Sequence, residues 1–136
     1  MATDLQLNKL MKGEENFNGC YMNTKLPTTL AKGSYLCCLG NAHWIAIYNF
    51  GTNCFVFDPL ALLFMPEIGL EMAKAFPFRK ALDKQFKGRV KYNDQRTEAL
   101  ESKDCGQWSV RYLKEAAQGK AHASKWLNEK TLIKYR

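Results

Sequence analysis

Two apolar runs separated by Gly51-Thr52 constrain the fold of this chain more than any other feature. In the stretch HWIAIYNFGTNCFVFDP, residues 43–59, aromatic and β-branched residues fill both runs. A glycine at the first central position of a two-residue loop is typical of a type II′ turn, so the stretch predicts a buried β-hairpin. This hairpin carries an imidazole at one end, His43, and a carboxylate at the other, Asp58.

The register of the hairpin decides whether His43 and Asp58 can meet. If residues 51–52 form the loop, Ile45 pairs with Asp58. Paired residues point to the same face and side chains alternate along a strand, so His43 and Asp58 become diagonal neighbours on one face. An aspartate there could orient the imidazole and stabilise its charged form. Taken alone, the pair also fits a histidine that merely ends a strand and an ordinary Asp-Pro turn, because a one-residue error in the loop reverses the parity.

A cysteine occupies the start of a predicted helix in SKDCGQWSVRYLKEAAQGK, residues 102–120. Asp104 with Gln107 resembles a capping box, which places Cys105 in the first turn. The apolar stripe of this helix consists of Val110, Leu113 and Ala117. Unpaired N–H groups and the positive end of the helix dipole stabilise a thiolate at such a position. Cys105 is therefore a candidate nucleophile, with a small buried core residue as the alternative.

The composition predicts one domain over residues 1–136. The chain has 136 residues, of which 46% are hydrophobic, enough for a single core. It has no apolar segment approaching about 18 residues, and acids interrupt its N-terminus, so we expect neither a membrane protein nor a secreted one. The five cysteines include no CxxC pair and predict reduced thiols, and with only two histidines we expect no metal site.

The other predicted elements complete this interpretation. Periodicity and proline positions predict helices over residues 4–12, 66–76 and 77–86, a buried strand over 34–40 and a short strand over 89–92. In the first of these helices the candidate apolar positions are Leu5, Leu7, Leu10 and Met11. We expect residues 17–27, FNGCYMNTKLP, to form a loop.

Positive charge is concentrated in the second half of the chain. Residues 79–136 hold fifteen Lys and Arg against seven Asp and Glu, whereas residues 1–78 hold five against six. The stretch RKALDKQFKGRVK makes a polyanion such as DNA a plausible partner, with a solvated helix face as the alternative. The candidate DNA-binding residues are Arg79, Lys80, Lys84, Lys87, Arg89 and Lys91.

Taken together, GNAHWIAIYNFGTNCFVFDPL and SKDCGQW at the start of a helix resemble the adenain family of adenovirus cysteine proteases and the related ubiquitin-like-protein proteases. The chain order His43, Asp58, Cys105 is the order of that family, and it differs from papain-like enzymes, in which the cysteine comes first. The resemblance covers residues 5–117, because LNKLMKGEENFNGCYMNTKLP is similar to the family's N-terminal helix and the loop that follows.

The resemblance implies a fold and a mechanism. The implied fold is α+β and of the adenain type, a mixed or antiparallel sheet flanked by helices, with the cysteine at the N-terminus of the central helix. In the mechanism Cys105 attacks the scissile carbonyl, His43 takes and returns the proton, and Asp58 orients His43. This chemistry requires no cofactor. Trp44 would either shield the histidine or pack in the core.

The same resemblance implies partners and a location. Substrates would be capsid or core precursors with glycine near the cleavage site, cleaved by a monomeric enzyme in the virion and the host-cell nucleus. DNA and a viral peptide activator are candidate cofactors. Two departures bear on this. The family's activator is disulfide-bonded to a cysteine upstream of the nucleophile, whereas the matching residues 87–90 contain none, and the chain is shorter than adenain at its C-terminal end.

A third departure concerns the oxyanion hole. The family uses a glutamine amide upstream of the cysteine, but Glu98 and Ala99 occupy the corresponding positions. An ionised Glu98 would repel a developing negative charge. Gln95 is the nearest glutamine, and a slightly longer loop could bring its amide to the same place. We therefore expect Gln95 to donate this hydrogen bond, with backbone donors alone as the alternative.

Three functions fit these features. The first is a thiol endopeptidase with a His-Asp-Cys triad that processes capsid or core precursors of a virus or viral-type transposon and is stimulated by DNA. The second is a protease that removes ubiquitin-like proteins with the same three residues. The third is a non-enzymatic DNA- or virion-binding protein on a degenerate protease fold. Reaction of Cys105 with a thiol-directed electrophile would separate the two enzymes from the third.

Overall fold

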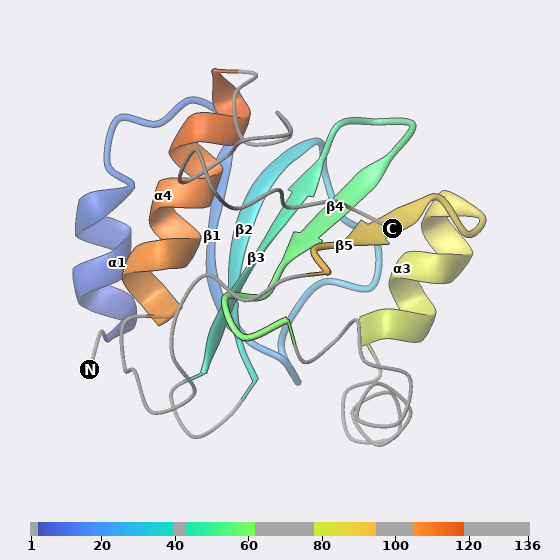
Figure 1. Cartoon of the computed structure of the whole chain (residues 1–136), viewed down its shortest axis with the longest axis horizontal. Helices are drawn as coiled ribbons and strands as arrows, with labels where there is room; N and C mark the ends of the chain where they lie inside the picture. The colour runs from blue at the N-terminus through green and yellow to red at the C-terminus, as the bar shows by residue number, and fades with distance from the viewer. Residues whose placement is uncertain (1–2, 40–42, 62–77, 95–104, 119–136) are drawn as a thin grey trace.

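A mixed sheet with helices on both faces forms the centre of the molecule (Figure 1). The computed structural model describes residues 3–39, 43–61, 78–94 and 105–118. The expected α+β class is confirmed. The elements are α1 (Asp4–Leu10), β1 (Phe17–Met22), β2 (Gly33–Cys38), β3 (Trp44–Asn49), β4 (Cys54–Phe57), α3 (Phe78–Phe86), β5 (Val90–Tyr92) and α4 (Cys105–Ala117).

The strands follow one another in space in the order β1-β2-β3-β4-β5. The three central strands β2, β3 and β4 are antiparallel neighbours, whereas β1 and β5 each pair in parallel with the strand beside them. The sheet is therefore mixed, and the hairpin of β3 and β4 lies at its middle, where it is buried on both faces.

Two hydrophobic cores lie on opposite faces of the sheet. Helices α1 and α4 cover one face, where Leu36, Trp44 and Phe57 pack against residues such as Tyr112 of α4. Helix α3 covers the other face with Leu82. Alternation along the strands produces this division, since neighbouring residues point to opposite faces. Cys37 and Cys38 accordingly belong to different cores, as their adjacency in the sequence predicts.

The predicted hairpin is confirmed, including its register. Asn49 pairs with Cys54 and Ala46 pairs with Phe57, which is the register given by a loop at residues 51–52. Gly51 has a φ of 101°, the positive value that the first central position of a type II′ turn requires. The strand predicted at 89–92 and the helix predicted at 77–86 are also confirmed, as β5 and α3.

The loop expected over residues 17–27 is wrong for its first half. Residues Phe17–Met22 form β1, an edge strand that pairs in parallel with β2. The register of this pairing shifts between Phe17 and Cys20, and Gly19 within that interval has a φ of 111°. The Asn18-Gly19 pair therefore marks a bulge inside a strand rather than a turn between elements.

Two helical faces differ from expectation. On α1, Leu7 is buried, but Leu5 is 78% exposed and Leu10 is 46% exposed, because a seven-residue helix presents only one short stripe to the sheet. On α4, the stripe continues through Ala116, whereas Ala117 is exposed. The helix predicted at 66–76 lies outside the described residues. Within the described ranges, no helix is long and apolar enough to cross a membrane.

Candidate active site

His43 and Asp58 meet at the end of the β3–β4 hairpin that lies away from its turn. His43 directly precedes β3 and Asp58 directly follows β4. The Nε2 atom of His43 lies 2.8 Å from Oδ1 of Asp58, within hydrogen-bond distance. The side chain of Asp58 is 1% exposed and that of His43 is 15% exposed. The carboxylate is therefore shielded from water, while the imidazole keeps an accessible edge.

The environment of His43 favours its protonated form. Burial lowers the pKa of His43, but hydrogen bonds to Asp58 and Cys105 and the charges of both side chains raise it more, from an ordinary value of 6.5 to about 10. The imidazole therefore carries a proton at neutral pH. Since Nε2 faces the carboxylate, Nδ1 is the nitrogen left for the sulfur of Cys105.

Asn93 fixes the backbone of Asp58 from the neighbouring strand. Its Oδ1 accepts a hydrogen bond of 2.7 Å from the N–H of Asp58, and its Nδ2 donates one of 2.7 Å to the Asp58 carbonyl. Asn93 is 1% exposed. The carboxylate is held as well, since Oδ1 of Asp58 accepts a hydrogen bond of 3.0 Å from the Leu60 N–H. These contacts preorganise the group that orients His43.

Cys105 is the first residue of α4, as the sequence predicts. The backbone N–H of Trp44 donates a hydrogen bond of 3.2 Å to Sγ of Cys105. The first-turn N–H groups of the helix also lie close to this end of α4. Cys105 is 6% exposed and belongs to the core between α4 and the sheet. Trp44 is 5% exposed and packs in the same core.

Three of the other cysteines have thiols whose pKa is raised. Burial raises the pKa of Cys37 to about 12 and that of Cys54 to about 12, and burial with the charge of Asp4 raises that of Cys20 to about 11. These thiols stay protonated at neutral pH and are poor nucleophiles. All five cysteines lie in described residues, and none is joined in a disulfide.

A stacked aromatic pair ties the two halves of the site together. The rings of Phe57, next to Asp58, and Tyr112 on α4 lie 4.9 Å apart and are nearly parallel, with 4° between their planes. Both residues are fully buried. This contact fixes α4 against the hairpin and thereby Cys105 against His43.

The residue expected to stabilise the oxyanion, Gln95, is not among the residues that the structure describes. Glu98 and Ala99 lie outside the described residues as well. The expected hydrogen bond of Gln95 to a tetrahedral intermediate stays a prediction.

The candidate DNA-binding residues divide into two kinds. Arg79 donates a hydrogen bond of 3.2 Å from Nε to the Tyr92 hydroxyl and also stacks on its ring, and Nε of Arg89 donates one of 3.0 Å to the Thr52 carbonyl. These two guanidinium groups support the fold. The exposed lysines of the set are Lys80, Lys84, Lys87 and Lys91.

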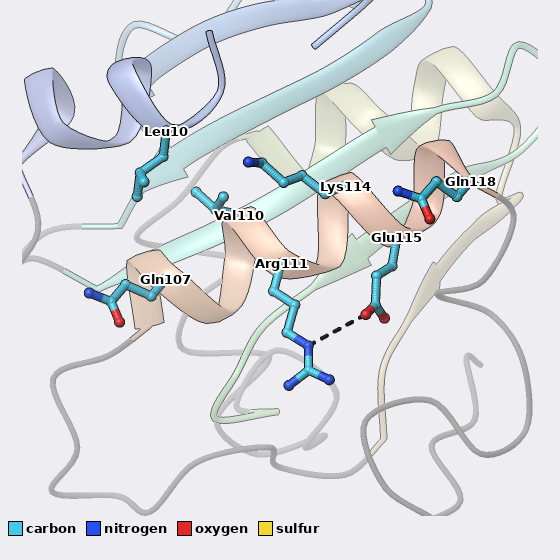
Figure 2. A pocket seen from close by; sticks show the side chains of 7 residues that line it. All are labelled: Leu10, Gln107, Val110, Arg111, Lys114, Glu115 and Gln118. Atoms are coloured by element: carbon cyan, nitrogen blue, oxygen red, sulfur yellow. Dashed lines mark ion pairs between the residues drawn. The ribbon is translucent and has the colours of Figure 1, made fainter. Parts of the chain in front are cut away.

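A separate pocket is lined by Leu10 of α1 and by residues of α4 (Figure 2). Its apolar wall contains Leu10 and Val110, and its polar wall contains the ion pair of Arg111 with Glu115, 3.5 Å apart. The triad residues do not line it. Among the described side chains, no cluster of three or more His, Cys, Asp or Glu could hold a metal ion.

The arrangement of Cys105, His43 and Asp58 is suited to nucleophilic catalysis by a cysteine. A thiol at a helix N-terminus, an imidazole hydrogen-bonded to it and a buried carboxylate on the far nitrogen form the relay that nucleophilic cysteine catalysis uses. A scan of this sequence against known protein families and a search of characterised proteins found no match.

Proposed function

We propose that this chain is a thiol endopeptidase of the adenain type, acting on capsid or core precursors of a virus or viral-type transposon. The observation that carries the proposal is the convergence of His43, Asp58 and Cys105 from two separate elements on one hydrogen-bonded chain. Each contributes the group that its predicted role needs.

The reaction follows from these groups. The Cys105 thiolate attacks the scissile carbonyl carbon, and the resulting oxyanion lies near the N–H groups of the first turn of α4. Protonated His43 gives its proton to the leaving amine, so the C–N bond breaks and a thioester remains. Neutral His43 then takes a proton from water, the hydroxyl attacks the thioester, and the acid is released as the thiolate re-forms beside protonated His43.

We expect the protein to cleave peptides that contain glycine at or next to the scissile bond. Both related families select small residues there, and a narrow channel would exclude side chains. The test is to profile the protein on a peptide library by mass spectrometry, with a ubiquitin-like C-terminal amide as a second substrate. Cleavage only of that amide would favour the deconjugating alternative. Strong selection for a bulky residue before the bond would contradict the glycine preference.

DNA is the candidate stimulator, and the exposed lysines in the second half of the chain favour it. Lys80 and Lys84 lie one turn apart on the same side of α3, and Lys87 follows just after the helix. Lys91 is the exposed residue of β5.

We predict that these lysines produce salt-dependent DNA binding with little sequence preference. Affinity should fall steeply with salt, with a logarithmic slope of about 0.9 for each phosphate bound. Replacing all four with alanine should make the slope smaller by about one for each phosphate that is no longer neutralised. Fluorescence anisotropy with a labelled duplex measures this. The matched control replaces four exposed lysines in the first half of the chain, namely Lys9, Lys12, Lys25 and Lys32. An equal effect of both sets would contradict a localised site.

A further inference from the structure

The backbone of Trp44 lies just beyond the ladder that joins β3 to β4. The last pair of that ladder is Ala46 with Phe57. In the same register the residue opposite Trp44 is Pro59, and proline has no N–H to donate. Both backbone groups of Trp44 are instead bonded to side chains of α4. Its N–H donates to Sγ of Cys105 at 3.2 Å, and its carbonyl accepts a hydrogen bond of 3.2 Å from Oγ of Ser109.

Ser109 is suited to this contact by its position and its burial. It follows Cys105 by four residues, so both side chains lie on one face of α4. It is fully buried, with an exposed fraction of 0%. A serine inside a helix commonly bonds back to the carbonyl four residues earlier. Here its hydroxyl crosses to the sheet, where it anchors the helix to the residue that contacts the nucleophile.

We propose that Ser109 is a positioning residue for the nucleophile. Its hydrogen bond holds α4 in the register at which the Trp44 N–H stays on the sulfur of Cys105. Because Trp44 directly follows His43, the same contact sets the spacing between base and nucleophile. The catalytic meaning of this contact rests on the proposed function, whereas its effect on the reactivity of the thiol does not.

The test is Ser109→Ala, measured by the rate at which iodoacetamide alkylates Cys105 as a function of pH. Alanine suits a helix, so the fold should be kept. Loss of the hydrogen bond from Ser109 should lower the alkylation rate of Cys105 across the neutral pH range about fivefold, the effect of one hydrogen bond. Mass spectrometry of the peptide that contains Cys105 gives the rate. A second measurement is hydrogen exchange of the Trp44 amide, which should become faster.

Ser34→Ala is the matched control. Ser34 is 4% exposed and lies on β2 opposite Tyr48, at the other end of the sheet from Trp44. It should leave both the alkylation profile and the Trp44 exchange rate unchanged. The inference is overturned if Ser109→Ala matches the wild type in both measurements, or if Ser34→Ala shifts them equally.

These outcomes are separate from the fate of the proposed function. If the wild-type protein cleaves peptides but Ser109→Ala leaves the alkylation profile unchanged, the positioning role of Ser109 is refuted and the proposed endopeptidase function is supported. If the wild-type protein cleaves no peptide, while Ser109→Ala lowers the alkylation rate of Cys105, the positioning role of Ser109 is supported and the proposed endopeptidase function is refuted.

Discussion

Replacing Cys105 with alanine is expected to abolish peptide hydrolysis. In the proposed mechanism the sulfur of Cys105 forms the covalent intermediate, and alanine offers no substitute. In hydrolases with such a relay, loss of the nucleophile lowers turnover by about 10⁶. The fold should persist, because alanine is a good helix former and the removed sulfur is a single atom at the first residue of α4. Turnover of a cleaved peptide from the library, together with thermal melting, measures both expectations.

The other cysteines provide the controls for this experiment. Cys54→Ala removes a sulfur that is completely buried in the opposite core. It should lower the melting temperature slightly and leave turnover near the wild-type value. Cys20, Cys37 and Cys38 should likewise tolerate alanine or serine with activity retained. Cleavage by Cys105→Ala at the wild-type rate would refute the assignment of the nucleophile and, with it, the mechanism.

The hairpin could be predicted because its determinants are local. Gly51 fixes the turn, and the turn fixes the register of every pair up to Ala46 with Phe57. That register alone brings His43 to Asp58, which lie 2.8 Å apart at their side chains. The start of α4 at Cys105 also agrees with the first helical turn that the local sequence predicts there. The two elements that carry the triad were therefore predictable one by one.

The supporting contacts were not predictable, because they join residues that are distant in the sequence. Asn93 reaches Asp58 only because β5 pairs in parallel with β4, and its neighbours in the sequence favour a polar loop. Ser109 reaches Trp44 across 65 positions. The signal that could have drawn attention to Asn93 is its place directly after the short apolar alternation of β5.

The edge strand β1 was missed for a related reason. Its sequence contains Asn18-Gly19, which favours turns, and its extended form depends on pairing with β2. Tertiary pairing here outweighs local preference. Gly33 shows how closely the two segments approach, since a Cβ at that position would lie 2.1 Å from the Asn16 carbonyl oxygen.

Replacing Asp58 with asparagine is also expected to cause a large loss of peptide turnover. Asparagine keeps an oxygen that can accept the bonds from His43 and from the Leu60 N–H, so the change removes charge more than shape. Turnover should fall by about 10³ to 10⁴, as it does where the carboxylate of such a relay is made neutral. Steady-state kinetics on a glycine-containing peptide measures this loss. Asp83→Asn, at an exposed position of α3, is the matched control and should keep wild-type turnover.

The physical reason for this loss is the protonation of His43. Burial lowers its pKa, and the bonds and charges of Asp58 and Cys105 raise it to about 10. Without the Asp58 charge the effect of burial gains weight, so the pKa should fall and the imidazole should lose its proton within the neutral range. A neutral imidazole cannot give a proton to the leaving amine. The alkaline limit of the pH–activity profile should therefore move to lower pH.

The same shift predicts how stability depends on pH. A histidine whose pKa is higher in the folded state than in the unfolded chain stabilises the fold fully below about 6.5 and loses that contribution as pH rises through about 10. The free energy of unfolding of the wild-type protein should accordingly fall across this pH interval. The free energy of unfolding of the Asp58→Asn variant should fall less. Denaturant unfolding at several pH values and NMR titration of His43 measure the two consequences. If the His43 midpoint in Asp58→Asn stays near the wild-type value, the carboxylate does not set the protonation of the base, and its role in the relay must be given up.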